Sequence, residues 1–317
     1  MDAPWLFDDD NVQRGRFAAP EKKKKKSKFL TFLSLLLVVG VVAGLLYVGT
    51  RLDYQKIDPD PPTSAEQARQ DMAVEAARIL SYSTHNGQSE LAAHAQKWLD
   101  MLGGVWQPWP DGNLPEGRTN PPYETEAPNQ ADPSYVIEQL NNLSASATDQ
   151  ASLYNDGERE SLVRIAIDAK ICAARVATNA GIEAPASGTL DMEHLAEVAD
   201  SDTLTALSQA RQWLEKDASL VYVTGRTALS ARIETITALE EAILARDTKD
   251  KRPAVAPLPQ LKDGQSLTNV ALSQIASTLI AKSSDASAEQ IRAIVAYVYS
   301  LYLSDPERAQ ADILPLQ

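Results

Sequence analysis

One apolar run stands out in a chain whose remaining pattern is amphipathic. Residues 29–49 contain no charged side chain. At about 1.5 Å of rise per residue, a helix of this length spans about 31 Å, which matches the hydrocarbon core of a bilayer. Lysines fill positions 22–26 and 28 before the run, and an excess of lysine stays on the cytoplasmic side. The pattern predicts a transmembrane helix at 29–49 that places residues 1–28 in the cytoplasm and exports the rest.

A cleaved signal peptide is the alternative for this run. Its apolar core would be shorter, and a small-residue cleavage site of the A-x-A type would follow. The sequence shows neither feature. We therefore expect an uncleaved, single-pass anchor that remains in the lipid bilayer.

Gly40 and Gly44 lie four residues apart and thus on one face of the predicted membrane helix. Small residues at this spacing let a second helix backbone approach closely. Residues 36–48 resemble the dimerisation motif of glycophorin A, with matching or conservatively replaced positions at Leu36, Leu37, Gly40, Val41, Gly44 and Leu45. The motif ends in Thr where this chain has Val48, so one interhelical hydrogen bond is missing. The resemblance implies a right-handed homodimer through the membrane helix.

After a Pro-rich linker at 50–62, apolar residues recur with the helical spacing i, i+3, i+4. The pattern predicts helices at about 63–84, 89–102, 134–143, 158–179, 191–198, 203–215, 226–245, 267–281 and 288–303. Thr63 and Ser64, followed by Glu66 and Gln67, supply caps for the first of them. No stretch alternates convincingly with period two. We predict an all-α extracytoplasmic multi-helix bundle at 63–304, followed by a C-terminal tail at 305–317.

Two Pro-rich breaks, at 103–133 and 247–265, interrupt the helices. The first contains Trp106, Trp109 and Tyr123. A long loop inside a compact domain is usually functional or disordered, and Trp has a large apolar face that suits protein hot spots or stacking on sugar rings. Two interpretations are open: the aromatic side chains pack on the bundle as a lid, or they bind an envelope protein or a wall glycan. We take these three residues as the predicted interaction site.

Composition and charge narrow the function classes. Hydrophobic residues make up 44% of the chain but aromatic residues only 6%, which favours close-packed helices of Ala, Leu, Ile and Val. The net charge is −13 although residues 1–28 are net basic, so the exported part is acidic and unsuited to nucleic acid. The single cysteine, Cys172, excludes a disulfide within one chain. It lies in the apolar stripe of the helix at 158–179, which predicts a buried, inert thiol.

Candidate chemistry is sparse. Glu90 precedes His94 by four residues, and Asp191, His194 and Glu197 follow at three-residue intervals. Ferritin-like bundles use Glu-x-x-His, a pattern that is absent here, so these groups are interpreted as surface polar residues. No nucleophile elbow or phosphate-binding glycine loop occurs. The sequence therefore predicts no catalytic residue, no metal site and no cofactor.

These observations favour a non-enzymatic protein. The predicted function is that of a membrane-anchored extracytoplasmic adaptor or assembly protein. The alanine-rich composition and the anchor fit a bacterial cell envelope. The alternative is an envelope enzyme or ferritin-like metal-binding bundle whose acidic site the sequence does not assign.

Overall fold

All of the regular structure in the described residues is helical. The computed structural model describes residues 61–109, 117–128, 131–221 and 223–303, which belong to one unit, Asp60–Gln317, hereafter the helical unit. No β-strand occurs in these ranges, which confirms the all-α prediction. The elements are α2 (Ser64–His85), α3 (Ser89–Leu102), α4 (Pro133–Gln150), α5 (Asp156–Asn179), α6 (Met192–Val198), α7 (Ser201–Ala218), α8 (Val223–Leu244), α9 (Leu267–Ala281), α10 (Ala288–Leu303) and the short 3-10 helices η1 (Ala151–Leu153) and η2 (Lys282–Asp285).

Local capping sets the ends of α2 and α3. The Thr63 N–H donates to Glu66 Oε2 at 2.8 Å, and the Glu66 N–H donates to Thr63 Oγ1 at 3.2 Å. This reciprocal pair satisfies backbone donors that the first helical turn leaves open. α3 ends where Gly103 takes φ +81°, a left-handed conformation that glycine adopts without steric cost.

α4 is longer than the pattern predicts. The prediction ends at residue 143, where Ser, Thr and Asp residues that favour caps and turns over helix interiors follow, but α4 continues to Gln150. One face of its second half, including Ser144, Ala147 and Thr148, is buried, and the Ser144 hydroxyl donates to the Ala166 carbonyl of α5 at 2.7 Å. Tertiary packing therefore overrides the weak local helix propensity.

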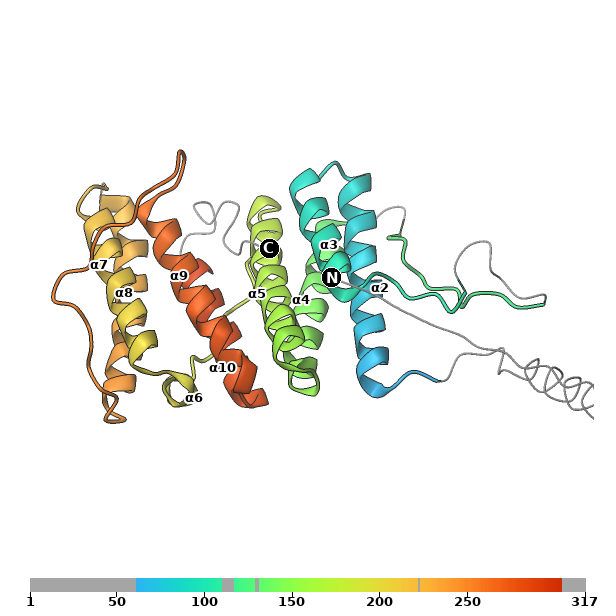
Figure 1. Ribbon diagram of the computed structural model, residues 1–317. Coiled ribbons are helices and arrows are strands. Elements are labelled where there is room, and N and C mark those ends of the chain that lie inside the picture. The colour runs from blue at the N-terminus through green and yellow to red at the C-terminus, as the bar shows by residue number, and fades with distance from the viewer. Residues whose placement is uncertain (1–60, 110–116, 129–130, 222, 304–317) are drawn as a thin grey trace, which may run out of the picture. The chain divides into compact units, whose positions relative to one another are not determined.

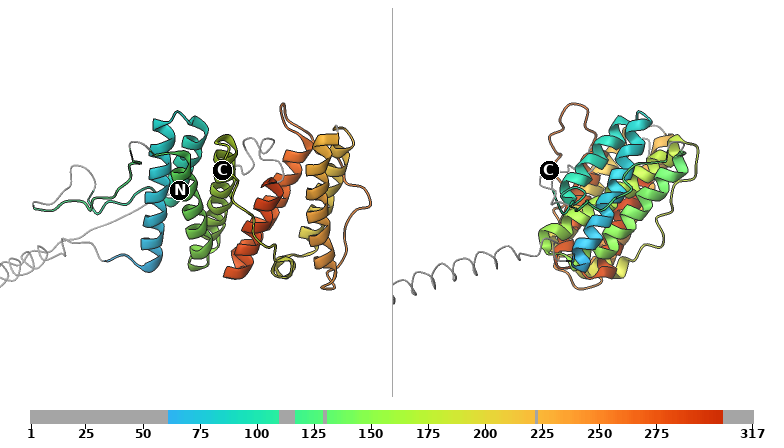
Figure 2. Two further views of the ribbon diagram at one scale, coloured as in Figure 1. Left: turned by 180° about the vertical axis from the view of Figure 1, so that it is seen from behind. Right: turned by 90° about the vertical axis from the view of Figure 1, so that its right-hand side faces the viewer.

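Neighbouring helices follow one another through the helical unit. α2 packs on α3 and α4, and α4 makes its most extensive contacts with α5. α5 also contacts α10, which in turn contacts α9, while α7 packs on both α8 and α9. Figure 1 shows α5 between α4 on one side and α10 on the other, and the view from behind in Figure 2 keeps this order. α5 thus connects the first helices of the unit to the last ones.

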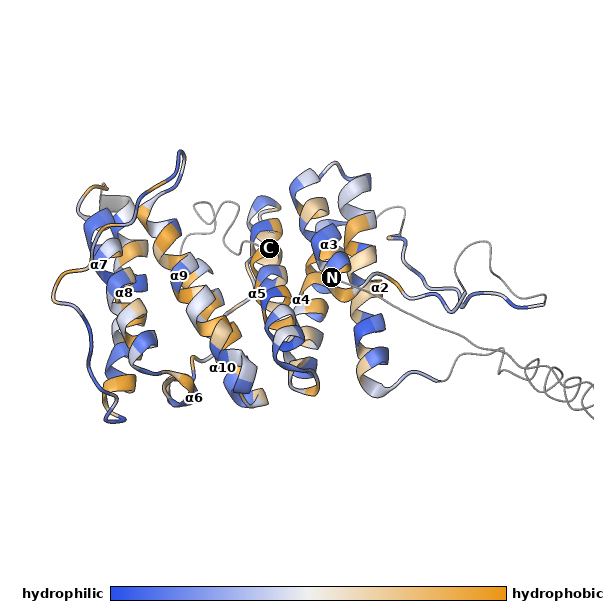
Figure 3. Cartoon of the chain, in the orientation of Figure 1, coloured by the Kyte–Doolittle hydropathy of each residue, from blue (hydrophilic) through white to orange (hydrophobic). Residues whose placement is uncertain are grey.

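The core is built mainly from small and aliphatic side chains. Each helix carries both hydrophilic and hydrophobic residues along its length (Figure 3), and the apolar ones are buried where helices meet. α10 is buried on most sides, since its aliphatic stripe and the tyrosines Tyr297, Tyr299 and Tyr302 are all inaccessible. This agrees with a central bundle helix.

None of the helices within the described ranges is long and apolar enough to cross a membrane. The predicted anchor at 29–49, with Gly40 and Gly44, lies outside these ranges. The anchor and its dimer motif stay predictions.

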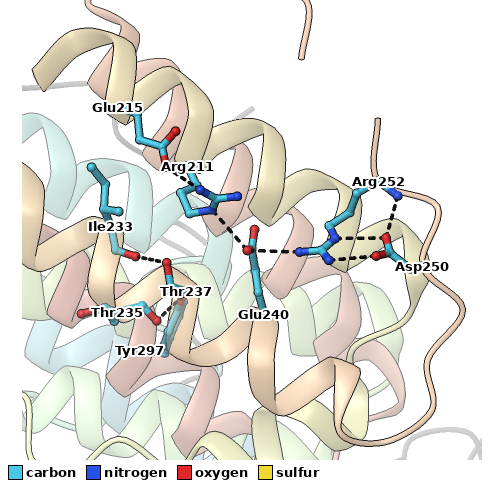
Figure 4. A network of polar contacts seen from close by, with 9 residues as sticks. All are labelled: Arg211, Glu215, Ile233, Thr235, Thr237, Glu240, Asp250, Arg252 and Tyr297. Atoms are coloured by element: carbon cyan, nitrogen blue, oxygen red, sulfur yellow. Dashed lines mark hydrogen bonds and ion pairs between the residues drawn. The ribbon is translucent and has the colours of Figure 1, made fainter. Parts of the chain in front are cut away.

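A buried carboxylate attaches the second Pro-rich break to the bundle. Glu240 of α8 is 3% exposed, and its Oε2 lies 3.2 Å from Arg211 Nε of α7 and 3.4 Å from Arg252 Nη1 in the segment after α8. Each guanidinium has a second carboxylate partner, Glu215 for Arg211 and Asp250 for Arg252 (Figure 4). Burial raises the pKa of the Glu240 carboxyl, and the two guanidiniums oppose this rise.

Replacing Glu240 by Ala is expected to destabilise the helical unit. The change removes the carboxylate that the two guanidiniums share and leaves a small cavity, so we expect a loss of about 1–3 kcal/mol in the free energy of unfolding. Urea unfolding followed by circular dichroism measures it. Glu241→Ala, at the adjacent exposed position, is the matched control and should stay close to wild type. Equal losses of unfolding free energy in both variants would show that the buried ion-pair network around Glu240 does not contribute to stability.

Candidate functional site

A pocket of about 370 Å³ lies where the first Pro-rich loop meets the start of α2. It is hereafter the aromatic pocket. Its walls come from α2, from the C-terminal end of α3 and from the loop. The lining residues are Pro62, Glu66, Gln67, Arg69, Gln70, Leu102, Gly103, Gly104, Trp106 and Tyr123.

Trp106 has a fixed backbone and an exposed ring. Its N–H donates to Gln70 Oε1 at 2.8 Å, and Gln70 Nε2 donates to its carbonyl at 3.5 Å. The Gln70 side chain is itself buried, since the residue is only 7% exposed. Trp106 nevertheless keeps 47% of its surface in solvent. An indole held in one place by its backbone loses little freedom when a partner covers it.

The segment that carries Tyr123 is also tied to α2. Arg78 Nε donates to the Glu124 carbonyl at 2.6 Å, and the Ala127 N–H donates to Ser81 Oγ at 3.1 Å. Two parts of the loop that are far apart in sequence therefore converge on one helix. Tyr123 and Trp106 line the same pocket as a result.

Trp109 is placed differently. Its N–H donates to Asn120 Oδ1 at 3.1 Å, and its carbonyl accepts from Asn120 Nδ2 at 2.7 Å. It is partly buried and is not among the residues that line the aromatic pocket. The structure thus brings Trp106 and Tyr123 together but leaves Trp109 outside, within the loop itself.

Two charged residues, Glu66 and Arg69, line the aromatic pocket. Glu66 is engaged in the α2 cap, and its pKa is lowered by the Thr63 backbone and side-chain hydrogen bonds. Arg69 Nη1 lies 3.7 Å from Glu158 Oε1, and both side chains are largely exposed. The pocket is lined by both apolar and polar side chains, a mixture that is typical of binding surfaces.

A second group of polar residues lies between α3 and α5 and is hereafter the His94 cluster: His94, Asp168 and Cys172. His94 Nδ1 lies 2.7 Å from Asp168 Oδ2, and the same oxygen accepts from Trp98 Nε1 at 2.8 Å. One potential ligand atom from each residue of the cluster lies within 4.8 Å of the others. Asp168 is 4% exposed and Cys172 is 3% exposed.

The His94 cluster borders a second pocket, of about 430 Å³. His94 and Cys172 line it together with Glu90 and Arg175, whose Oε2 and Nη2 atoms lie 2.6 Å apart. Burial acts to lower the pKa of His94, but the hydrogen bond and charge of Asp168 outweigh it and raise that pKa. Burial raises the pKa of the Cys172 thiol well above its usual range, and the Asp168 carboxylate adds to the effect.

The sequence pattern identifies only part of this cluster. It predicts that Cys172 is buried, and the structure confirms this. It does not single out Asp168, although an acid one turn before Cys172 in an otherwise apolar stripe is a signal that it has a buried partner. Of the histidine groups considered, Glu90 and His94 border the second pocket. Asp191 and His194 instead form an exposed pair at the start of α6, where His194 Nδ1 lies 2.7 Å from Asp191 Oδ2. Neither residue lines the second pocket.

Comparison of the chain with protein-family models, with curated proteins and with solved structures gives no match. Its function is therefore inferred from its own residues.

Glu75 of α2 makes the stability of the helical unit depend on pH. Burial raises the pKa of its carboxyl from 4.5 to about 7, with Arg78 opposing and Asp71 adding to the shift. Between these two values the folded chain holds a proton that the unfolded chain has released. The free energy of unfolding should therefore fall as pH rises from about 4.5 through about 7.

Glu75→Gln should remove that part of the pH dependence. At pH 8 we expect the variant to be more stable than wild type by about 1–2 kcal/mol, less than the whole shift implies because the carboxyl is partly solvated. Urea unfolding at pH 5 and pH 8 measures the difference. Glu126→Gln, at an exposed position of the nearby loop, is the control. If both variants keep the wild-type pH profile, Glu75 is not the group responsible.

Trp98→Phe should destabilise the helical unit, whereas Trp106→Phe should leave its stability close to wild type. Both changes remove an indole N–H, but only the Trp98 N–H satisfies a buried carboxylate, and Trp98 is fully buried. We expect Trp98→Phe to lower the free energy of unfolding by about 1–3 kcal/mol. Thermal unfolding of the two variants side by side tests this, and similar melting temperatures for both would refute it.

Proposed function

We propose that the chain is a membrane-anchored extracytoplasmic adaptor or assembly protein of the cell envelope. Its helical unit binds an envelope protein or a wall glycan at the aromatic pocket. The observation that carries the proposal is the half-exposed indole of Trp106, whose backbone the buried Gln70 amide holds. Catalysis plays no part in this function.

The contact chemistry of the aromatic pocket suits such partners. Trp and Tyr are enriched among the residues that dominate binding energy, and they act best in a pocket whose surroundings exclude water. Tyr123 lines the same pocket as Trp106, and the polar lining residues include Glu66, Gln67 and Arg69. A flat aromatic face with amide and charged neighbours fits an apolar side chain of a protein or the face of a sugar ring.

The position of the aromatic pocket fits an anchored protein. Pro62, the last residue of the linker 50–62, lines the pocket. With the predicted membrane helix at 29–49, the binding surface then lies where the chain enters the helical unit. A homodimer through Gly40 and Gly44 would present two such surfaces, which increases the apparent affinity for a repetitive partner.

In-cell crosslinking of the full-length protein, followed by affinity capture and mass spectrometry, tests the proposal. Wild type should capture a discrete envelope partner or glycan. A Trp106→Ala/Tyr123→Ala variant should lose at least about tenfold of that capture, as expected for hot-spot residues. Its melting temperature should stay close to wild type, because Trp106 is half exposed.

Leu153→Ala is the matched control, since Leu153 is a large apolar residue that is 54% exposed and does not line the aromatic pocket. It should capture the partner as wild type does. Equal capture by the double variant, or a large fall in its melting temperature, would instead assign the aromatic side chains to packing of the loop.

A further inference from the structure

We propose that His94, Asp168 and Cys172 bind one divalent transition-metal ion of the zinc class, with a free coordination position towards the pocket of about 430 Å³. This site is distinct from the aromatic pocket and does not depend on the adaptor function.

The three ligands come from two facing helices. His94 lies on α3, and Asp168 and Cys172 lie one turn apart on α5. Their ligand atoms lie within 4.8 Å of one another. A tetrahedral ion bound at about 2.0–2.3 Å needs its ligand atoms about 3.3–3.8 Å apart. His94 Nδ1 and Asp168 Oδ2, at 2.7 Å, must separate by about half an ångström, and a pair near the 4.8 Å limit must close by about 1 Å. Rotations of the three side chains supply both changes.

The set of ligands matches the ion in kind and in charge. Imidazole, thiolate and carboxylate are the protein groups that bind zinc. A thiolate and a carboxylate together carry two negative charges, so a divalent ion makes the buried site neutral overall. Binding releases the thiol proton of Cys172 to solvent, and the ion takes the place of the hydrogen atom between His94 Nδ1 and Asp168 Oδ2. The ion thus replaces protons in an enclosed site where an unpaired charge would be costly.

The surroundings complete the site. Trp98 Nε1 donates to Asp168 Oδ2 at 2.8 Å, and an outer hydrogen bond of this kind orients a metal-binding carboxylate. His94 and Cys172 line the second pocket, which provides the access route and the space for a fourth ligand such as water. Arg175 and Glu90 border the same pocket as an ion pair. An incoming anionic ligand would therefore meet Arg175 beside the ion.

The exposed pair Asp191 and His194 offers an internal comparison. His194 Nδ1 lies 2.7 Å from Asp191 Oδ2, the same separation as in the His94 cluster. Both side chains are more than a third exposed, and both belong to one helix start. No thiol joins them in the described part of the chain. The pair lacks the third ligand and the enclosure that distinguish the His94 cluster.

Cobalt titration of the full-length protein tests the site. The protein is purified in detergent under reducing conditions, stripped of metal with a chelator, and titrated with Co²⁺. We expect one equivalent to bind with a thiolate-to-cobalt charge-transfer band, and Zn²⁺ to displace it. The chain contains one cysteine, so any such band arises from Cys172. Absence of the band in wild type overturns the proposal.

Variants test the cysteine and histidine ligands. Cys172→Ser should abolish the band, and His94→Gln should weaken Co²⁺ binding at least about tenfold. His194→Gln, the matched control, should bind as wild type does. Unchanged affinity in both cluster variants would place the metal elsewhere and refute the site. Circular dichroism without metal checks that each variant folds. If one does not, the wild-type band alone decides, because only Cys172 produces it.

Discussion

The carboxylate of Asp168 holds α3 against α5, and both candidate sites depend on where α3 lies. α3 packs mainly on α2 and meets α5 at few points. At that contact, His94 and Trp98, one turn apart on α3, both reach the same oxygen of Asp168. A buried carboxylate is unfavourable without donors, so the carboxylate requires these two α3 side chains beside it. The C-terminal end of the same helix, at Leu102 to Gly104, forms one wall of the aromatic pocket.

The apolar core provides the stability that such polar contacts need. Alanines are buried throughout α5, which lies between α4 and α10. Small side chains let helices approach closely, and the Ser144 hydroxyl can then reach the Ala166 carbonyl across the interface of α4 and α5. A core with few aromatic residues gains less area per side chain. Close packing of many residues compensates for the smaller area buried per side chain. The buried polar groups determine which helices meet.

Local patterns in the sequence predict the helices well and the sites only in part. Helical periodicity and the Thr63–Glu66 cap depend only on residues that are close in sequence, so both can be predicted directly from the sequence. The extension of α4 to Gln150 depends on burial against α5, which no local pattern contains. The His94–Asp168 bond joins residues 74 positions apart, and the Gln70–Trp106 bond joins residues 36 positions apart. The aromatic residues of the loop stand out by composition, but the place of Trp106 in the aromatic pocket depends on its distant bond with Gln70. Trp109 is instead bonded to Asn120 within the loop.

Helix side chains also hold the described parts of both Pro-rich segments in place. Proline lacks an N–H, and such segments make few backbone hydrogen bonds of their own. In the first break, Gln70 holds the backbone of Trp106. In the second, the Ala256 N–H donates to Gln212 Oε1 at 2.8 Å, and Trp213 Nε1 donates to the Pro257 carbonyl at 2.9 Å. Neither break behaves as a free tether at these points. The polar side chains that hold them belong to rigid helices, and a loop fixed in this way can present an exposed aromatic ring without first having to be ordered by its partner.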